Sequence, residues 1–133
     1  MTTTQQIGLV EPIAETLHNN MQPRTNDGVE YCQKMVNASL ARVLALVVTS
    51  TCDQAVTVRL VGHTVDSATD ENGLVDIGSG LNLAATNGKL VISVVVEEAW
   101  MPYMAVRVIA GATAPSSGRI VVQAFGQKWV SGE

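Results

Sequence analysis

The sequence feature that most constrains the fold is a series of short segments in which apolar and polar side chains alternate. Residues 55–61 alternate in this way, and so do residues 103–110. Alternation with a period of two is typical of a strand that buries one face. No helical period appears after residue 40, and turn signals recur about every ten residues. The pattern predicts an all-β fold, an antiparallel β-sandwich or barrel that is jelly-roll-like.

One segment, residues 42–49, is apolar on both faces and reads RVLALVVT. A strand of this kind is expected in the centre of a sheet whose two faces are both covered. Residues 29–36 give a mixed and weaker strand signal. Residues 89–96 hold the densest run of β-branched side chains, which favours a strand there as well.

Turn signals predict two hairpins. Asn87-Gly88 lies between two apolar runs, which indicates a tight type I′ hairpin because both central positions need positive φ. The turn at residues 111–118 separates residues 103–110 from residues 119–125. We therefore expect those two strands to pair with each other.

The first 28 residues differ from the rest of this 133-residue chain, because they are rich in Thr, Gln and Asn and hold only isolated apolar side chains. We predict an extended N-terminal arm over residues 1–28 and a β-sandwich domain over residues 29–133. Pro12 could begin a short helix through Leu17. The arm is either a frayed terminus or a segment that orders on a partner. Its anchors on a partner would be the apolar residues Ile7, Leu9, Val10, Ile13 and Leu17.

The composition indicates that another chain covers part of the surface. Charged residues make up 15% of the sequence and hydrophobic residues 47%, whereas about 25% of an ordinary soluble domain is charged. The net charge is −4 and no two basic residues are adjacent, which argues against nucleic acid as the partner. No apolar run approaches the ~18 residues of a membrane helix, so no membrane contact is expected.

The two cysteines, Cys32 and Cys52, are expected to be free buried thiols rather than a disulfide. The N-terminus lacks the basic and apolar regions of a signal peptide. Synthesis in a reducing cytoplasm is therefore expected, and disulfides are rare there.

No pattern of residues indicates catalysis or metal binding. The acidic loop over residues 66–73 could offer oxygens to calcium, but it lacks EF-hand spacing and reads better as a solvated loop. His18 and His63 have no second His or Cys at metal-ligand spacing. Cys32 and His63 could in principle form a nucleophile and a base. We predict instead a protein that is not an enzyme, with no catalytic residue, no metal and no cofactor.

Three large aromatic residues suggest a possible surface contact. Trp100, Tyr103 and Trp129 could serve as stacking platforms for a carbohydrate. The alternative is that Trp100 and Tyr103 pack around Pro102 at the start of a strand. We retain Trp100 and Tyr103 as candidate contact residues.

A resemblance to a known class of proteins rests on the C-terminal third of the chain. Residues 100–108 read WMPYMAVRV, a Ser/Gly-rich turn follows, and residues 119–126 read RIVVQAFG. Together with residues 56–62, VTVRLVG, this resembles the closing strands of small β-sandwich virion proteins of tailed bacteriophages. The resemblance covers about residues 41–130, and many sandwiches share its motifs.

The resemblance, taken with the predicted arm, implies a capsid decoration or cement protein. Such a protein would be a homo-oligomer, with a trimer favoured, and would bind the lattice of the major capsid protein in the virion after synthesis in the host cytoplasm. A tail, baseplate or fibre component of the same kind of particle is the first alternative. A carbohydrate- or receptor-binding module is the second.

Overall fold

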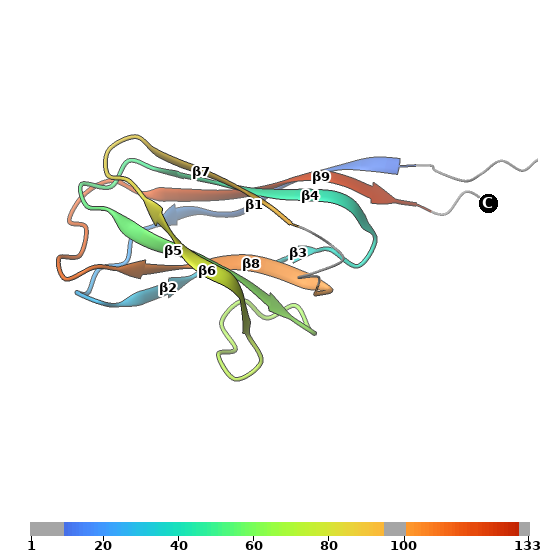
Figure 1. Cartoon of the computed structure of the whole chain (residues 1–133), viewed down its shortest axis with the longest axis horizontal. Coiled ribbons are helices and arrows are strands. Elements are labelled where there is room, and N and C mark those ends of the chain that lie inside the picture. The colour runs from blue at the N-terminus through green and yellow to red at the C-terminus, as the bar shows by residue number, and fades with distance from the viewer. Residues whose placement is uncertain (1–9, 95–100, 131–133) are drawn as a thin grey trace, which may run out of the picture.

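The protein is an antiparallel β-sandwich, which confirms the predicted all-β fold. The computed structural model describes residues 10–94 and 101–130, and within them every regular element is a strand. Two sheets pack face to face, one above the other in Figure 1. Their inner faces enclose one hydrophobic core, as expected for a sandwich of this size.

The upper sheet, here called sheet A, has four strands, and the lower sheet, sheet B, has five. Sheet A runs in the order β1 (Val10–Met21), β9 (Ile120–Trp129), β4 (Ala41–Ser50) and β7 (Gly88–Ser93). Sheet B runs in the order β2 (Val29–Tyr31), β8 (Tyr103–Ala110), β5 (Val56–His63) and β6 (Val75–Leu83), and β3 (Val36–Asn37) also pairs with β8.

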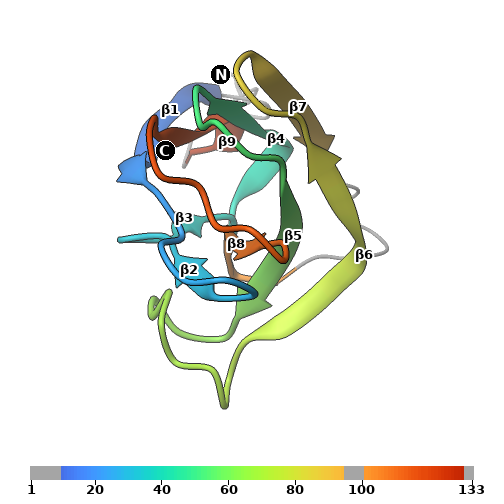
Figure 2. The same ribbon diagram turned by 90° about the vertical axis from the view of Figure 1, so that its left-hand side faces the viewer.

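The order of the strands is that of a jelly roll. The short strands β2 and β3 both pair with β8 and together form one edge of sheet B. Apart from the step between them, the chain crosses to the other sheet after every strand except β5, which forms a hairpin with β6 (Figure 2). The first and last strands that the structure describes, β1 and β9, are neighbours in sheet A.

Both predicted hairpins are wrong, and for the same reason. Strand β6 before Asn87-Gly88 belongs to sheet B and β7 after it belongs to sheet A. The turn there uses positive φ at Thr86, at 72°. The turn after β8 likewise crosses between sheets, so β8 pairs with β5 and β9 pairs with β4. A turn signal reports a reversal of the chain, and it cannot report which sheet receives the next strand.

The predicted separate arm needs correction, because Val10–Met21 form an integral strand of the sandwich. β1 pairs with β9 along its length, from Val10 opposite Trp129 to Met21 opposite Ile120, with two bulges. Pro12 lies within this strand and begins no helix. Residues 13, 17 and 21 are all buried. A spacing of four residues fits one face of a strand as well as one face of a helix, so the sequence left this segment ambiguous.

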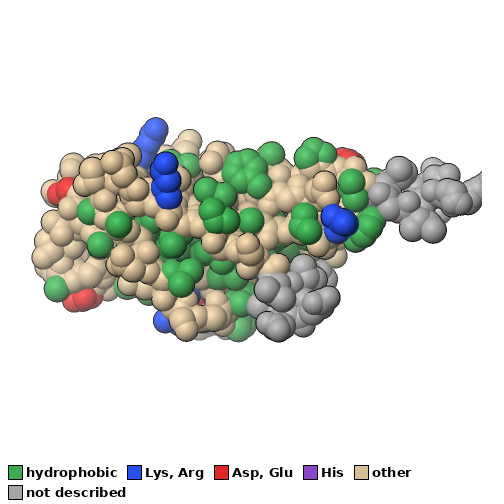
Figure 3. Space-filling model, turned by 45° about the horizontal axis from the view of Figure 1, so that its top comes forward, with side chains coloured by type: hydrophobic (Ala, Val, Ile, Leu, Met, Phe, Trp, Pro, Cys, Tyr) green, Lys and Arg blue, Asp and Glu red, His purple; other side chains and the backbone are tan. Residues whose placement is uncertain are grey.

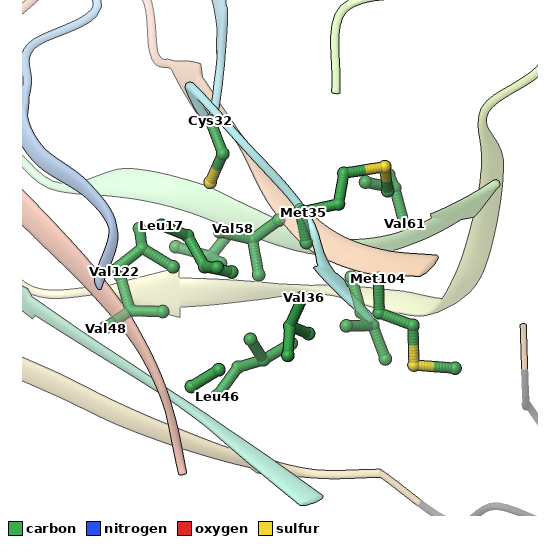
Figure 4. Packing of buried hydrophobic residues seen from close by; sticks show 14 of the residues in the cluster. Leu17, Cys32, Met35, Val36, Leu46, Val48, Val58, Val61, Met104 and Val122 are labelled. Atoms are coloured by element: carbon green, nitrogen blue, oxygen red, sulfur yellow. The ribbon is translucent and has the colours of Figure 1, made fainter. Parts of the chain in front are cut away.

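The core is aliphatic and lies between the two sheets. Figure 4 shows Leu46, Val48 and Val122 of sheet A pointing toward Val58 of sheet B, with Val36 of β3 beside them. These five side chains are fully buried. Aliphatic β-branched residues pack well on pleated surfaces, which explains how a chain with so few aromatic residues closes its interior.

Candidate interaction surface

The outer face of sheet A carries a band of exposed apolar side chains. Val91 is 66% exposed, Val43 is 47% exposed, and Phe125 and Trp129 are each 41% exposed. Figure 3 shows hydrophobic side chains along this face, with acidic groups only at its margins. The band follows from alternation, since inward residues of the same strands fill the core. We call this surface the apolar face and define it by Val10, Val43, Val47, Val91, Phe125 and Trp129.

Cross-strand pairing brings the members of the apolar face together. Val47 of β4 lies opposite Val91 of β7, and Val10 of β1 lies opposite Trp129 of β9. Neighbours of this kind are close enough to form one continuous patch. The ends of β1 and β9 also project beyond sheet B (Figure 1), so the patch extends past the second layer of the sandwich.

The charged groups on this side of sheet A are all basic among the described residues. Arg42 donates a hydrogen bond to Gln127 Oε1 at 3.0 Å and lies 5.7 Å from the centre of the Trp129 ring, within range of a cation–π contact. At the opposite end, Lys89 and Arg119 line a hollow of about 240 Å³. Within the described chain these three side chains form no ion pair, so they are available to carboxylates of a partner.

The free edge of β1 is protected against the addition of another strand. The backbone N–H of Trp129 donates to Leu40 O at 2.8 Å, so Trp129 directs its backbone groups away from β1. The N–H and C=O of one residue point to the same side in an antiparallel ladder, and the side alternates along the strand. By this alternation Pro12, opposite Gln127, occupies a position whose N–H would face the free edge. Proline in that place removes a donor and disfavours edge-to-edge pairing.

The outer face of sheet B is partly covered by the chain itself. The loop over residues 64–74, which joins β5 to β6, lies against it (Figure 1). His63 holds the loop, because its Nδ1 accepts from the Val65 N–H at 3.0 Å and its Nε2 lies 3.1 Å from Asp70 Oδ2. The Tyr31 hydroxyl donates to Glu71. These acidic groups therefore serve to hold the loop in place.

Two arginines lie opposite each other on the same face. Arg59 of β5 and Arg107 of β8 are cross-strand partners, and like charges in that position repel. Asp76 contacts both, with its Oδ2 at 3.5 Å from Arg59 Nη1 and 2.7 Å from Arg107 Nη2. The carboxylate thus neutralises much of the repulsion. We assign this group a structural role in joining β5, β6 and β8.

The residues predicted to contact a partner are distributed unevenly. Ile7, Leu9 and Trp100 lie outside the described residues. Val10 is 39% exposed and belongs to the apolar face. Two further predicted residues, Ile13 and Leu17, are buried in the core, and Tyr103 is half-buried against it. Their side chains therefore stabilise this chain's own fold and are not free to anchor it on another.

The sequence reasoning missed most of the apolar face. It did not single out Val43, Val91 or Phe125 as contact residues. A signal was present in residues 42–49, which are apolar on both faces. Their inward residues contribute to the core, whereas Val43 is 47% exposed in the described structure. The segment thus has the apolar pattern of a strand that is covered on both faces, whereas the described chain covers only one of them.

Catalytic chemistry has little support in the described part of the chain. No group of three or more His, Cys, Asp or Glu there could hold a metal ion. The ring nitrogens of His63 contact Asp70 and the Val65 N–H. Both nitrogens are thus engaged by groups other than the Cys32 thiol. Cys32 and Cys52 are free and buried, as predicted.

Burial makes both thiols unreactive. It raises the pKa of Cys32 to about 12, from an ordinary value of 9.0, and it also raises the pKa of Cys52. We expect neither thiol of the native protein to react with a thiol reagent near pH 8, and both to react in urea, because the thiolate is the nucleophile. Fast labelling of native protein, detected by mass spectrometry, would contradict this.

Since the folded thiol of Cys32 ionises at higher pH than the unfolded one, its contribution to the free energy of unfolding falls between pH 9.0 and about 12.

No model of a known protein family and no curated protein matches this chain. Among the described residues no helix is long and apolar enough to cross a membrane.

Proposed function

We propose that this chain is a non-enzymatic structural protein of a virus particle, which decorates and cements the capsid shell. It would form a small homo-oligomer, with a trimer favoured, and bind between subunits of the major capsid protein. The observation that carries the proposal is the apolar face. Uncovered apolar patches with polar margins are typical of surfaces that bind other proteins.

The fold and the composition add support. Jelly rolls recur among viral capsid proteins, although lectins and cupins share the architecture, so the fold alone assigns no activity. The low content of charged residues fits a chain whose surface is partly covered by other chains of an assembly. In an oligomer, several copies would engage one shell at once, and the avidity would exceed the affinity of a single copy.

The test is co-sedimentation of the purified protein with empty shells of the virus whose genome encodes it. We expect the wild-type protein to move with the shells in a density gradient. Val91→Asp places a charge on the apolar face, on its edge strand β7, at a position 66% exposed, so it should leave the fold intact. The charge should prevent copies from assembling through the apolar face, and loss of the oligomer removes the avidity. Shell binding should therefore weaken by about tenfold or more.

The matched control is Val29→Asp, at a position on β2 that is 43% exposed in sheet B. It makes the same chemical change away from the apolar face and should bind shells as the wild type does. A wild-type protein that stays at the top of the gradient would show that the shell is not its partner. Co-sedimentation with tails instead of shells would favour the tail component.

A carbohydrate-binding function keeps one observation in its favour. The Trp129 side chain is 41% exposed and has the Arg42 guanidinium beside its ring, an arrangement that could stack on a sugar. Glycan-array binding that disappears in Trp129→Ala would support this second candidate over the first.

A further inference from the structure

The loop that joins β5 to β6 is an exposed apolar and acidic surface. Val65 is 52% exposed in the loop. Asp66 is exposed beside Val65 and forms no ion pair within the described chain. Glu71 is also exposed and accepts a hydrogen bond from the neutral Tyr31 hydroxyl. The loop thus combines an exposed apolar side chain with negative charge that forms no ion pair within the described residues.

The apolar face has the complementary character. Its charged neighbours Arg42, Lys89 and Arg119 are all basic and form no ion pair in the described chain. Acidic side chains of β1, such as Glu11 and Glu15, occupy the opposite parity to the outward residues. Two apolar faces packed against each other would therefore bring like charges together with no carboxylate between them, which disfavours a symmetric face-to-face contact.

We propose that the apolar face of one copy binds the β5–β6 loop of a second copy. The Val65 side chain would pack on Val91 and its neighbours. A carboxylate such as that of Asp66 would enter the hollow lined by Lys89 and Arg119. This pairing covers the apolar side chains and also neutralises charges that each copy leaves unpaired.

The two surfaces lie on opposite layers of the sandwich (Figure 1), so each copy would use both of them with different neighbours. Such a head-to-tail contact closes into a ring when successive copies are suitably rotated. This assignment deepens the homo-oligomer of the proposed function. It is tested on the protein alone, so its outcome is independent of whether the oligomer binds a capsid.

The experiment compares two charge-reversed variants by analytical ultracentrifugation at about 100 µM, well above the Kd of a micromolar contact. The face variant carries Lys89→Glu and Arg119→Glu. The loop variant carries Val65→Lys and Asp66→Lys. All four positions are exposed, and circular dichroism will confirm that each variant folds. We expect the wild type to form oligomers, and each variant alone to lose association by at least about tenfold.

Mixing the two variants in equal amounts gives the sharper result. The loop of the face variant and the apolar face of the loop variant are both unaltered, so the mixture should form heterodimers and nothing larger. Val29→Lys on the outer side of sheet B, at a position 43% exposed, is the control and should associate as the wild type does.

Two results would overturn the assignment. A wild-type protein that is monomeric at this concentration would show that the two surfaces do not bind each other. A loop variant that associates as strongly as the wild type would show that the loop is not the partner of the apolar face.

Discussion

Deletion of residues 1–21 should abolish folding. The deletion removes β1, and with it the ladder to β9 and the buried side chains of Leu17 and Met21. Domains are stable by about 5–15 kcal/mol, and loss of several core side chains exceeds that margin. Circular dichroism of the purified truncated protein checks this, because the strand signal and the cooperative thermal transition of the wild type should both be missing.

A single substitution tests the same point without shortening the chain. Leu17→Ala should reduce the free energy of unfolding by about 2–5 kcal/mol, because Leu17 is 1% exposed. Val10→Ala on the same strand, at a position 39% exposed, should change it by less than about 0.5 kcal/mol. Equal stability of Leu17→Ala and wild type in urea titrations would mean that β1 does not pack as described.

Gly118→Ala should destabilise the protein by about 3 kcal/mol or more. Gly118 adopts a φ of +86°, a conformation that costs a residue with a Cβ about 1–2 kcal/mol. An added Cβ would also lie 2.1 Å from the backbone oxygen of Thr51, which cannot move freely. Thr51 is held by its N–H to Arg119 O at 2.9 Å, and Gly118 O itself accepts from Gln22 Nε2 at 2.8 Å. Relief of the clash would therefore break contacts between the last turn and the body of the sandwich.

Gly78→Ala provides the matched control for the glycine prediction. Gly78 also has positive φ, at +76°, but an added Cβ there meets nothing within 4 Å. It should cost only the backbone strain of about 1–2 kcal/mol. Urea titrations of both variants measure the difference, which isolates the steric clash at Gly118. Equal losses for the two variants would show that the chain around Thr51 adjusts without cost.

Local patterns in the sequence predicted the local structure well. Alternation over residues 55–61 and 103–110 identified β5 and β8, and the doubly apolar segment 42–49 identified β4, which lies between β9 and β7 in sheet A. Burial of alternate side chains is a property of the strand itself. It can therefore be read without knowing which strands are neighbours.

Pairing and the interaction surface were beyond the sequence, because both depend on distant residues. Nothing near Val10 indicates that its partner is Trp129, and nothing near residue 110 shows that the next strand enters the other sheet. The apolar face exists only because four strands from separate parts of the chain align their outward side chains. Val91 and Phe125 read as ordinary strand residues until that alignment is known.

The adjacency of the first and last strands has a consequence for synthesis. β9, the partner of β1, leaves the ribosome only after every other strand that the structure describes. At about 5–20 residues per second, β1 remains unpaired for several seconds after it emerges. Sheet A cannot close until β9 has been made, so the sandwich is expected to complete its fold only after that point. Until β9 is available for pairing, Pro12 at the free edge of β1 and the sparse apolar content of the N-terminal segment limit premature aggregation.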